Sequence, residues 1–342
     1  MIRNQWFAGT LVAMVVPALG LAAKPDSGTK VTYQYSRHGE ANAKDVSTTP
    51  LVVLSGGGTD VLGAFKQMCV ANNGGDFLVL GTSTFNKNYF SYIRNACIDA
   101  GKPANSVSVL IVPDAAAAKH PFVSETISQA ETIWIAGGDQ SDYVSFWGNS
   151  PMQTALNRRI QEGAVIGGIS AGLNVLTEFV YTAQGSSTVT SSLALANPNS
   201  ESITLIQNFV SVHALEGLIG DPHFAARDRM GRDLAFLYRI FNQFTSTVAR
   251  GVSVDEGTAV IISRAKKTWT AEVIGTGNTY VLQPTKLPST LSPDSPLDGV
   301  EVDVFRVGPG GQFDLSKWSG AHYSVSAVNG VLSSTQAGNS IY

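Results

Sequence analysis

Short apolar runs alternate with amphipathic segments through the first half of the chain, and this alternation is typical of repeated βαβ units. Five runs have the length and composition of buried strands: LVVLSGGG (51–58), FLVLG (77–81), SVSVLIV (106–112), TIWIAGGDQ (132–140) and AVIGGIS (164–170). The segments after them carry apolar residues at helical spacing. Strands that are apolar throughout indicate a parallel sheet sandwiched by helices. The pattern therefore predicts an α/β protein with a flavodoxin-like sheet.

The pattern changes in the second half of the chain. Residues 180–202 are rich in Ser and Thr and are expected to form an irregular excursion, whereas residues 225–244 have the periodicity of a long helix. The runs 248–256 and 257–263 are expected to form a strand pair. Three later runs predict the antiparallel strands of a C-terminal extension: WTAEVIG (269–275), TYVLQ (279–283) and VEVDVFRV (300–307). The last twenty residues are polar and weakly patterned.

The N-terminus has the features of a secretory signal peptide. Arg3 precedes an apolar run at 7–23 that ends in small residues. This run contains Pro17 and is short for a permanent membrane span, so we expect none, with an uncleaved anchor as the alternative. The mature protein is therefore expected to be secreted or periplasmic. The expected organisation is a signal peptide at 1–23, a polar leader at 24–49 with an edge strand near 30–36, a catalytic α/β domain at 50–285 and an extension packed on it at 286–342.

Composition narrows the classes of partner. Hydrophobic residues make up 44% and charged residues 14% of the 342 positions, and the formal net charge is −3. Without a basic excess or a Lys/Arg run, nucleic acid is not an expected partner. No cofactor is expected, and a homodimer is compatible with a sequence that does not determine the oligomeric state. An exported protein can hold a disulfide between Cys69 and Cys97, but two separately buried thiols fit equally well.

Ser170 lies in the pattern G-x-S-x-G, formed by residues 168–172 at the end of the fifth strand run. A nucleophilic serine on a strand-to-helix elbow needs small neighbours, because its backbone is strained. Parallel sheets bind ligands at the carboxyl ends of their strands, where this serine is expected. The amide of Ala171 at the helix start lies where the helix dipole favours the negative charge of an oxyanion. The alternative is that Ser170 only caps a helix.

A serine nucleophile needs a base and an acid that orients the base. His223 lies in a turn after an apolar strand, before an Arg-rich helix start, and is the strongest candidate for the base; His213 is expected on a strand face instead. The orienting acid is open among Asp221, Asp255 and Glu256. The last two follow a buried strand, where acids are costly without a partner, although they could also form a hairpin tip. No metal is expected, because Asp221, His213 and His223 match no zinc spacing.

Four motifs in this order resemble the serine peptidase family of cyanophycinase and aspartyl dipeptidase. They are GGDQ (137–140), GGISAG (167–172), DPHFAARDRMGR (221–232) and VSVDEGTAVII (252–262). The resemblance covers roughly residues 50–315. It implies a fold like that of class I glutamine amidotransferases. It also implies a Ser-His-Glu triad that works through an acyl-enzyme, with Ser170 as nucleophile, His223 as general base and acid, and Glu256 orienting His223. The oxyanion would then lie between the amide of Ala171 and that of Gly138 in the turn of residues 137–138.

The resemblance further implies a peptide polymer as substrate, namely cyanophycin, an arginylated polyaspartate that would be cut into β-aspartyl-arginine dipeptides. Guanidinium groups bind carboxylates well. The residues expected to contact substrate are Asp139, Gln140, Asp221, Arg227, Arg229 and Arg232. For the three arginines, the alternative is a solvated helix face paired with acids.

The sequence departs from cyanophycinases at Pro222, where they typically have Gln, and at residues 169–173, where they have Thr-Ser-Ala-Gly-Ala. These positions are expected to line the pocket, so the departures bear on the substrate more than on the triad. Two alternatives remain: a peptidase for other aspartyl or isoaspartyl peptides, and a catalytically inactive binding homologue.

Overall fold

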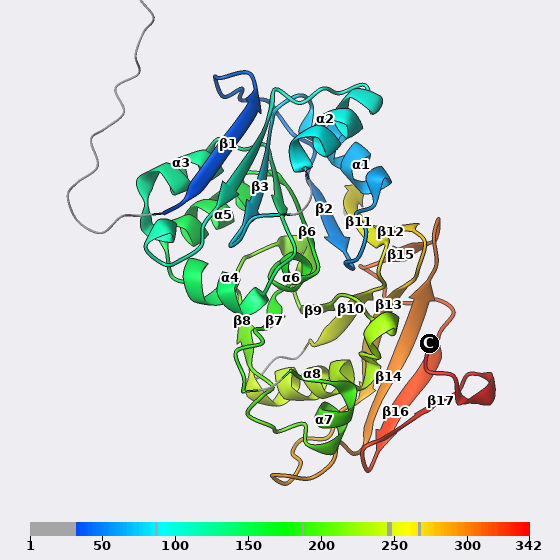
Figure 1. Ribbon diagram of the computed structural model, residues 1–342. Coiled ribbons are helices and arrows are strands. Elements are labelled where there is room, and N and C mark those ends of the chain that lie inside the picture. The colour runs from blue at the N-terminus through cyan, green and yellow to red at the C-terminus, as the bar shows by residue number, and fades with distance from the viewer. Residues whose placement is uncertain (1–31, 86–87, 187, 245–247, 266–267) are drawn as a thin grey trace, which may run out of the picture. The chain divides into compact units, whose positions relative to one another are not determined.

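The computed structural model describes residues 32–85, 88–186, 188–244, 248–265 and 268–342, and their strands form two sheets (Figure 1). The five predicted strand runs lie together in the first sheet, where they pair in parallel in the order β4-β3-β5-β6-β2. They are β2 (Leu51–Ser55), β3 (Asp76–Gly81), β4 (Ser106–Ile111), β5 (Thr132–Ile135) and β6 (Val165–Ile169). The protein is therefore of the mixed α/β kind.

Antiparallel strands extend both edges of this sheet. β1 (Gln34–Gly39) comes from the polar leader and pairs with β4, close to the edge strand expected there. On the opposite side the order continues from β2 to β11 (Thr258–Ala265), β12 (Thr268–Gly275) and β15 (Gln312–Asp314).

Helices cover both faces of the first sheet because successive side chains of its strands point in opposite directions. Val53 packs with α1 (Leu62–Asn72) and α2 (Tyr89–Asp99). Val52 and Leu54 pack with the other helices, on the opposite face. Those helices are η1 (Ala117–Lys119), α3 (Pro121–Ser128), α4 (Gln140–Trp147), α5 (Pro151–Gln161) and the short α6 (Ala171–Asn174).

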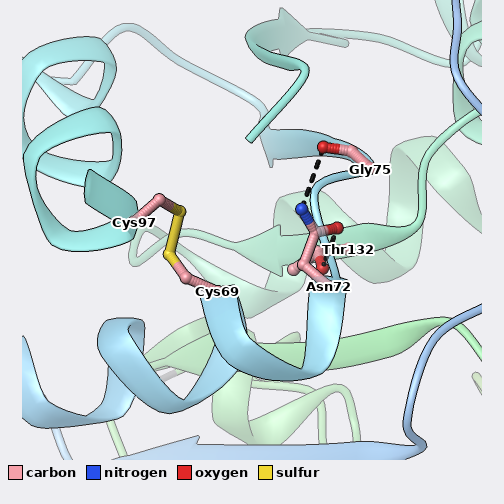
Figure 2. The surroundings of a disulfide bond; sticks show 5 residues. All are labelled: Cys69, Asn72, Gly75, Cys97 and Thr132. Carbon is pink, nitrogen blue, oxygen red and sulfur yellow. Dashed lines mark hydrogen bonds between the residues drawn. A yellow bond between two sulfur atoms is a disulfide. The ribbon is translucent and has the colours of Figure 1, made fainter. Parts of the chain in front are cut away.

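A disulfide joins α1 to α2, and this resolves the alternative that the sequence left open. Cys69 and Cys97 are bonded with a Cα–Cα distance of 5.0 Å (Figure 2). A crosslink that closes a loop of this size stabilises a fold by about 3 to 4 kcal/mol through the unfolded state. Beside it, the buried Asn72 donates to the Gly75 carbonyl at 2.9 Å and accepts from the Thr132 hydroxyl at 2.8 Å. The end of α1 is thereby tied to β3 and β5.

The second sheet has the order β17-β16-β14-β13-β10-β9-β7-β8. Its strands are β7 (Phe179–Tyr181), β8 (Leu205–Gln207), β9 (Leu218–Asp221), β10 (Arg250–Val254), β13 (Thr279–Lys286), β14 (Val300–Val307), β16 (Tyr323–Val328) and β17 (Val331–Ser334). Strand β9 runs parallel to both of its neighbours, β7 and β10. The remaining helical segments of the described chain are α7 (Ser191–Ala196), η2 (His213–Leu215), η3 (Ala225–Arg227), α8 (Met230–Gln243) and η4 (Ala337–Asn339).

The strand pair expected from the runs 248–256 and 257–263 is wrong. β10 pairs with β9 and β13 in the second sheet, whereas β11 pairs with β2 and β12 in the first. The chain therefore crosses from one sheet to the other at residues 255–257. The hydrophobic pattern did not distinguish this crossing from a hairpin tip, because both place short polar residues between two apolar strands.

The expectations about the two ends of the chain and the domain boundary are only partly tested by the described residues. The signal peptide at 1–23 and the leader up to residue 31 lie outside the described residues. The weakly patterned end of the chain contains β16 and β17 as a hairpin. The second sheet takes strands from both sides of the boundary expected at 285 and 286, and that boundary stays a prediction. Among the described helices, none has the length and apolar character needed to cross a bilayer.

Candidate active site

Ser170 occupies a strained turn between β6 and α6. Its backbone has φ 56° and ψ −117°, a conformation that non-glycine residues rarely adopt. Close packing explains the flanking glycines, since a Cβ on Gly168 would lie 2.5 Å from the Gly172 carbonyl carbon and one on Gly172 would lie 2.1 Å from the Ile135 oxygen. The Ser170 side chain makes no capping bond to the helix. The helix-cap alternative is therefore wrong.

His223 follows the end of β9 and contacts this serine. Its Nε2 is 2.8 Å from the Ser170 Oγ. The residue itself has φ 50°, and its backbone N–H donates to the Gly56 carbonyl at 2.7 Å. The imidazole lies against Gly57, where a Cβ would come within 2.2 Å of the ring. Two contacts with the end of β2 thus fix both the backbone and the ring of the histidine.

Glu256 is the acid that contacts His223. Its Oε1 is 2.5 Å from His223 Nδ1, and its side chain is 42% exposed. Asp255 instead accepts from the backbone N–H groups of Ala225 at 2.9 Å and Asn278 at 3.0 Å. The crossing between the sheets therefore assigns its two neighbouring acids to different tasks, one to the histidine and one to the backbone.

The surroundings of His223 favour the neutral form of its imidazole. Burial lowers the pKa of His223 below its ordinary value of 6.5, and the charges of Arg227 and Arg229 act in the same direction. The hydrogen bond with Glu256 opposes this shift. A neutral ring with its proton on Nδ1 would donate to Glu256 and leave Nε2 free to accept the Ser170 proton. This is the protonation state that a general base needs.

Asp221 and two of the arginines do not fit the substrate contacts expected for them. Asp221 is 1% exposed and accepts from Arg229 Nη1 at 2.9 Å and Arg232 Nε at 2.7 Å. Burial acts to raise the pKa of Asp221, but the charges of Arg232 and Arg229 outweigh it and lower the pKa. Arg229 Nη1 also donates to the Pro222 carbonyl at 2.6 Å. These groups are committed to one another, and they hold the turn that carries His223.

The remaining substrate candidates lie at the surface. Arg227 is exposed on η3, and no ion pair of its side chain occurs within the described part of the chain. Asp139 is also exposed and accepts from the Ser141 N–H at 2.9 Å, which caps α4. Gln140, the first residue of α4, is half-buried. Of the expected set, these three remain available to a ligand.

The two expected oxyanion donors lie on the neighbouring turns. Ala171 begins α6, so its N–H has no acceptor within that helix. In the other turn Gly137 is the residue nearest the serine, since a Cβ there would lie 3.5 Å from the Ser170 Cβ. Gly138 is exposed and packs near the Tyr143 hydroxyl. The role of both amides stays a prediction.

The departures from cyanophycinases do not line an open pocket. Ile169 is 6% and Leu173 0% exposed, and they belong to hydrophobic clusters on opposite faces of the first sheet. Pro222 is buried as well. The expectation that these side chains face the substrate is therefore wrong, because side chains beside an elbow alternate into the core. His213 also differs from its expected strand position: it lies exposed on η2, with its Nδ1 2.7 Å from Glu216 Oε1.

The glycines that follow β2 contact the histidine side of the site, a role that was not predicted for them. Gly57 contacts the His223 ring, and a Cβ on Gly58 would lie 3.2 Å from the Glu256 Cβ. Both have positive φ, 104° and 69°. A run of three glycines after a buried strand was the available signal, and it marks a backbone that passes close under two side chains.

The fold and the hydrogen bonds from Ser170 through His223 to Glu256 define a class, the α/β proteins with the side-chain arrangement of serine hydrolases. Residues 117–269 match the family model of Peptidase family S51. Over this segment, which is less than half of the chain, the sequence is similar to that family.

The chain is 26% identical over 179 residues to the cyanophycinase of Synechococcus elongatus, which is 52% of this chain and 49% of that protein. It is 26% identical over 180 residues to the cyanophycinase of Geminocystis herdmanii, 52% of this chain and 59% of that protein. The chain spans about half the length of the curated relatives it matches. A solved peptidase from an acI-B1 Actinobacterium is 17% identical and covers 79% of this chain and 98% of its own, with a TM-score of 0.50. This last likeness concerns the fold alone.

Proposed function

We propose that this protein is a serine-type peptidase in which Ser170 is the nucleophile, His223 the general base and acid, and Glu256 the group that orients the histidine. The observation that carries the proposal is the pair of distances, 2.8 Å from Ser170 Oγ to His223 Nε2 and 2.5 Å from His223 Nδ1 to Glu256 Oε1. The strained backbone of Ser170 adds support, since nucleophile elbows share it.

In this mechanism Ser170 Oγ attacks the scissile carbonyl while His223 Nε2 takes its proton. The amides of Ala171 and of the Gly137–Gly138 turn, with Gly138 as the predicted donor, would stabilise the oxyanion. His223 then gives the proton to the leaving amine, and an acyl-enzyme forms. Water attacks this ester with His223 again as base, which releases the acid and restores the serine.

The substrate we propose is cyanophycin, cut into β-aspartyl-arginine dipeptides. The support is the name of the curated relatives, cyanophycinase, together with three polar side chains that are exposed or half-buried. Arg227 could pair with a substrate carboxylate, and Asp139 and Gln140 could bind the cationic and amide groups of its arginines. Because the departures at 169, 173 and 222 are buried, they give no reason to prefer another substrate.

The finer fold and the location belong to the same proposal. A flavodoxin-like, class I glutamine amidotransferase-like arrangement of the first sheet would put Ser170 at the carboxyl edge of its parallel strands, where such sheets bind ligands. With residues 1–23 as a signal peptide, the enzyme would be secreted or periplasmic and would digest polymer released by other cells.

Incubation of the purified protein with insoluble cyanophycin tests the proposal. We expect β-aspartyl-arginine by mass spectrometry, little cleavage of short α-aspartyl peptides, and a fluorophosphonate adduct on Ser170. Ser170→Ala should fold normally and abolish both product and adduct. An adduct with cleavage only of other aspartyl peptides would retain the serine peptidase and reject the substrate. Folded protein that gives no adduct would reject the mechanism and favour an inactive binding homologue.

A further inference from the structure

Two residues of the turn that carries His223 have strained backbone conformations. Between β9 and α8, both His223 and Asp228 are non-glycine residues with positive φ, 50° and 47°. Such conformations persist only where surrounding contacts determine them. The turn therefore depends on groups outside itself, and some of these come from far along the chain.

Helix α8, which follows the turn, begins without a cap of its own. Its N-cap residue is Arg229, whose side chain makes no capping hydrogen bond. The backbone N–H of Met230 donates instead to the phenol oxygen of Tyr342 at 2.9 Å, and that hydroxyl donates to Asp228 Oδ1 at 2.9 Å. One phenol thus accepts from the first N–H of the helix and donates to the strained aspartate before it.

The ring of Tyr342 reaches the residue next to the histidine. It packs edge-on against Phe224, with ring centroids 5.6 Å apart, and against Tyr280 at 5.9 Å. Phe224 is fully buried and directly follows His223. The segment is itself held by the Tyr323 hydroxyl, which donates to the Ile341 carbonyl at 2.9 Å.

We infer that Tyr342 is a positioning residue for His223, acting through Phe224 and Asp228 from the end of the chain that follows β17. It touches no reacting atom. Without its hydroxyl, the turn would lose the cap of α8 and the anchor of Asp228, and the imidazole would no longer be held at hydrogen-bond distance from both Ser170 and Glu256. The functional consequence rests on the proposed role of His223.

The test compares Tyr342→Phe, which keeps the ring and removes both hydrogen bonds, with Tyr35→Phe. Tyr35, in the edge strand β1, is a matched control. It is half-buried, packs edge-on against Phe122, and its hydroxyl forms a hydrogen bond with the Ser108 hydroxyl at 3.3 Å. Two quantities are measured: the rate of fluorophosphonate labelling of Ser170, and the NMR signals and pKa of the His223 ring, assigned with His223→Gln.

We expect Tyr342→Phe to slow labelling by about 10-fold to 10²-fold, as for a slightly misplaced catalytic group, and to shift the His223 signals. Asp228→Gly, which removes the carboxylate at a position with positive φ, should do the same, and the double variant should be no worse than the single ones. Tyr342→Phe signals and labelling equal to those of Tyr35→Phe would overturn the inference. If Tyr342→Phe fails to fold, Asp228→Gly decides on the same readouts. If wild type takes no label, the proposed function fails, and the ring signals alone decide whether Tyr342 positions the histidine.

Discussion

The two halves of the candidate site are built in different ways. Ser170 lies in a contiguous segment, the strand-turn-helix of residues 165–174, directly after an interior strand of the first sheet. His223 follows the end of β9 in the second sheet, and Glu256 lies where the chain crosses between the sheets. The serine half therefore depends on local geometry, and the histidine half on contacts between segments distant in sequence.

This difference sets where each half is vulnerable. The positive φ at Ser170 is maintained by close backbone packing among Gly168, Gly172 and β5. The turn of His223 is maintained by the Gly56 carbonyl, the Arg229 side chain and Asp255. We therefore expect substitutions far from the serine in sequence to disturb the base while leaving the nucleophile's elbow unchanged.

The largest expected effect is a loss of activity at Glu256, in contrast to a loss of stability at its neighbour Asp255. Glu256→Gln should lower kcat by about 10² to 10⁴-fold, because an amide cannot stabilise the imidazolium as a carboxylate does. Its thermal midpoint should change little, since the side chain is 42% exposed. Asp255→Asn should do the reverse and reduce stability by about 1 to 3 kcal/mol through a lost backbone hydrogen bond. Steady-state kinetics and thermal melts check both; equal losses of kcat would remove the distinction between the two acids.

The second largest effect concerns a buried cluster of charged side chains next to the His223 turn. The cluster consists of Asp221, Arg229, Arg232 and Asp233. Arg232→Met should lower the free energy of unfolding by about 3 to 5 kcal/mol, because it leaves Asp221 charged and poorly paired in the interior. Asp233 provides the contrast within the same cluster. Burial and the neighbouring charge of Asp221 raise the pKa of Asp233 well above its ordinary value. The Asp233 carboxyl also accepts a hydrogen bond from the Ser253 hydroxyl.

Asp233→Asn, which replaces a carboxyl that is already disposed to be neutral, should cost less than about 1.5 kcal/mol. Chemical denaturation measures both variants. A larger loss for Asp233→Asn than for Arg232→Met would mean that the charge of the cluster lies on Asp233 and not on Asp221.

The same contrast explains how far sequence reasoning could go. The five parallel strands and the elbow of Ser170 could be predicted, because each is defined by a short apolar run or by neighbouring small residues. The crossing at residues 255–257 could not, since two apolar strands separated by a polar turn look the same whether they share a sheet or not. For the same reason the sequence left three acids open for His223. Arg229 and Arg232 were expected at the ligand because helical spacing does not reveal a buried partner such as Asp221.

The smallest expected effect is electrostatic and also falls on the histidine half. Because burial lowers the pKa of His223, the rate of fluorophosphonate labelling should fall only as the pH drops through a value below 6.5, where the protonated ring can no longer accept the Ser170 proton. Arg227→Met removes a positive charge that helps to lower this pKa, so the acid limb should move to higher pH by a fraction of a unit.

Raising the salt concentration should reduce that difference, because the Arg227 charge is exposed and screened. Arg158→Met, which removes an exposed arginine paired with Glu162, is the control and should leave the limb in place. An acid limb that stays in place in Arg227→Met, or that moves equally in both variants, would show that the Arg227 charge does not set the pKa of His223.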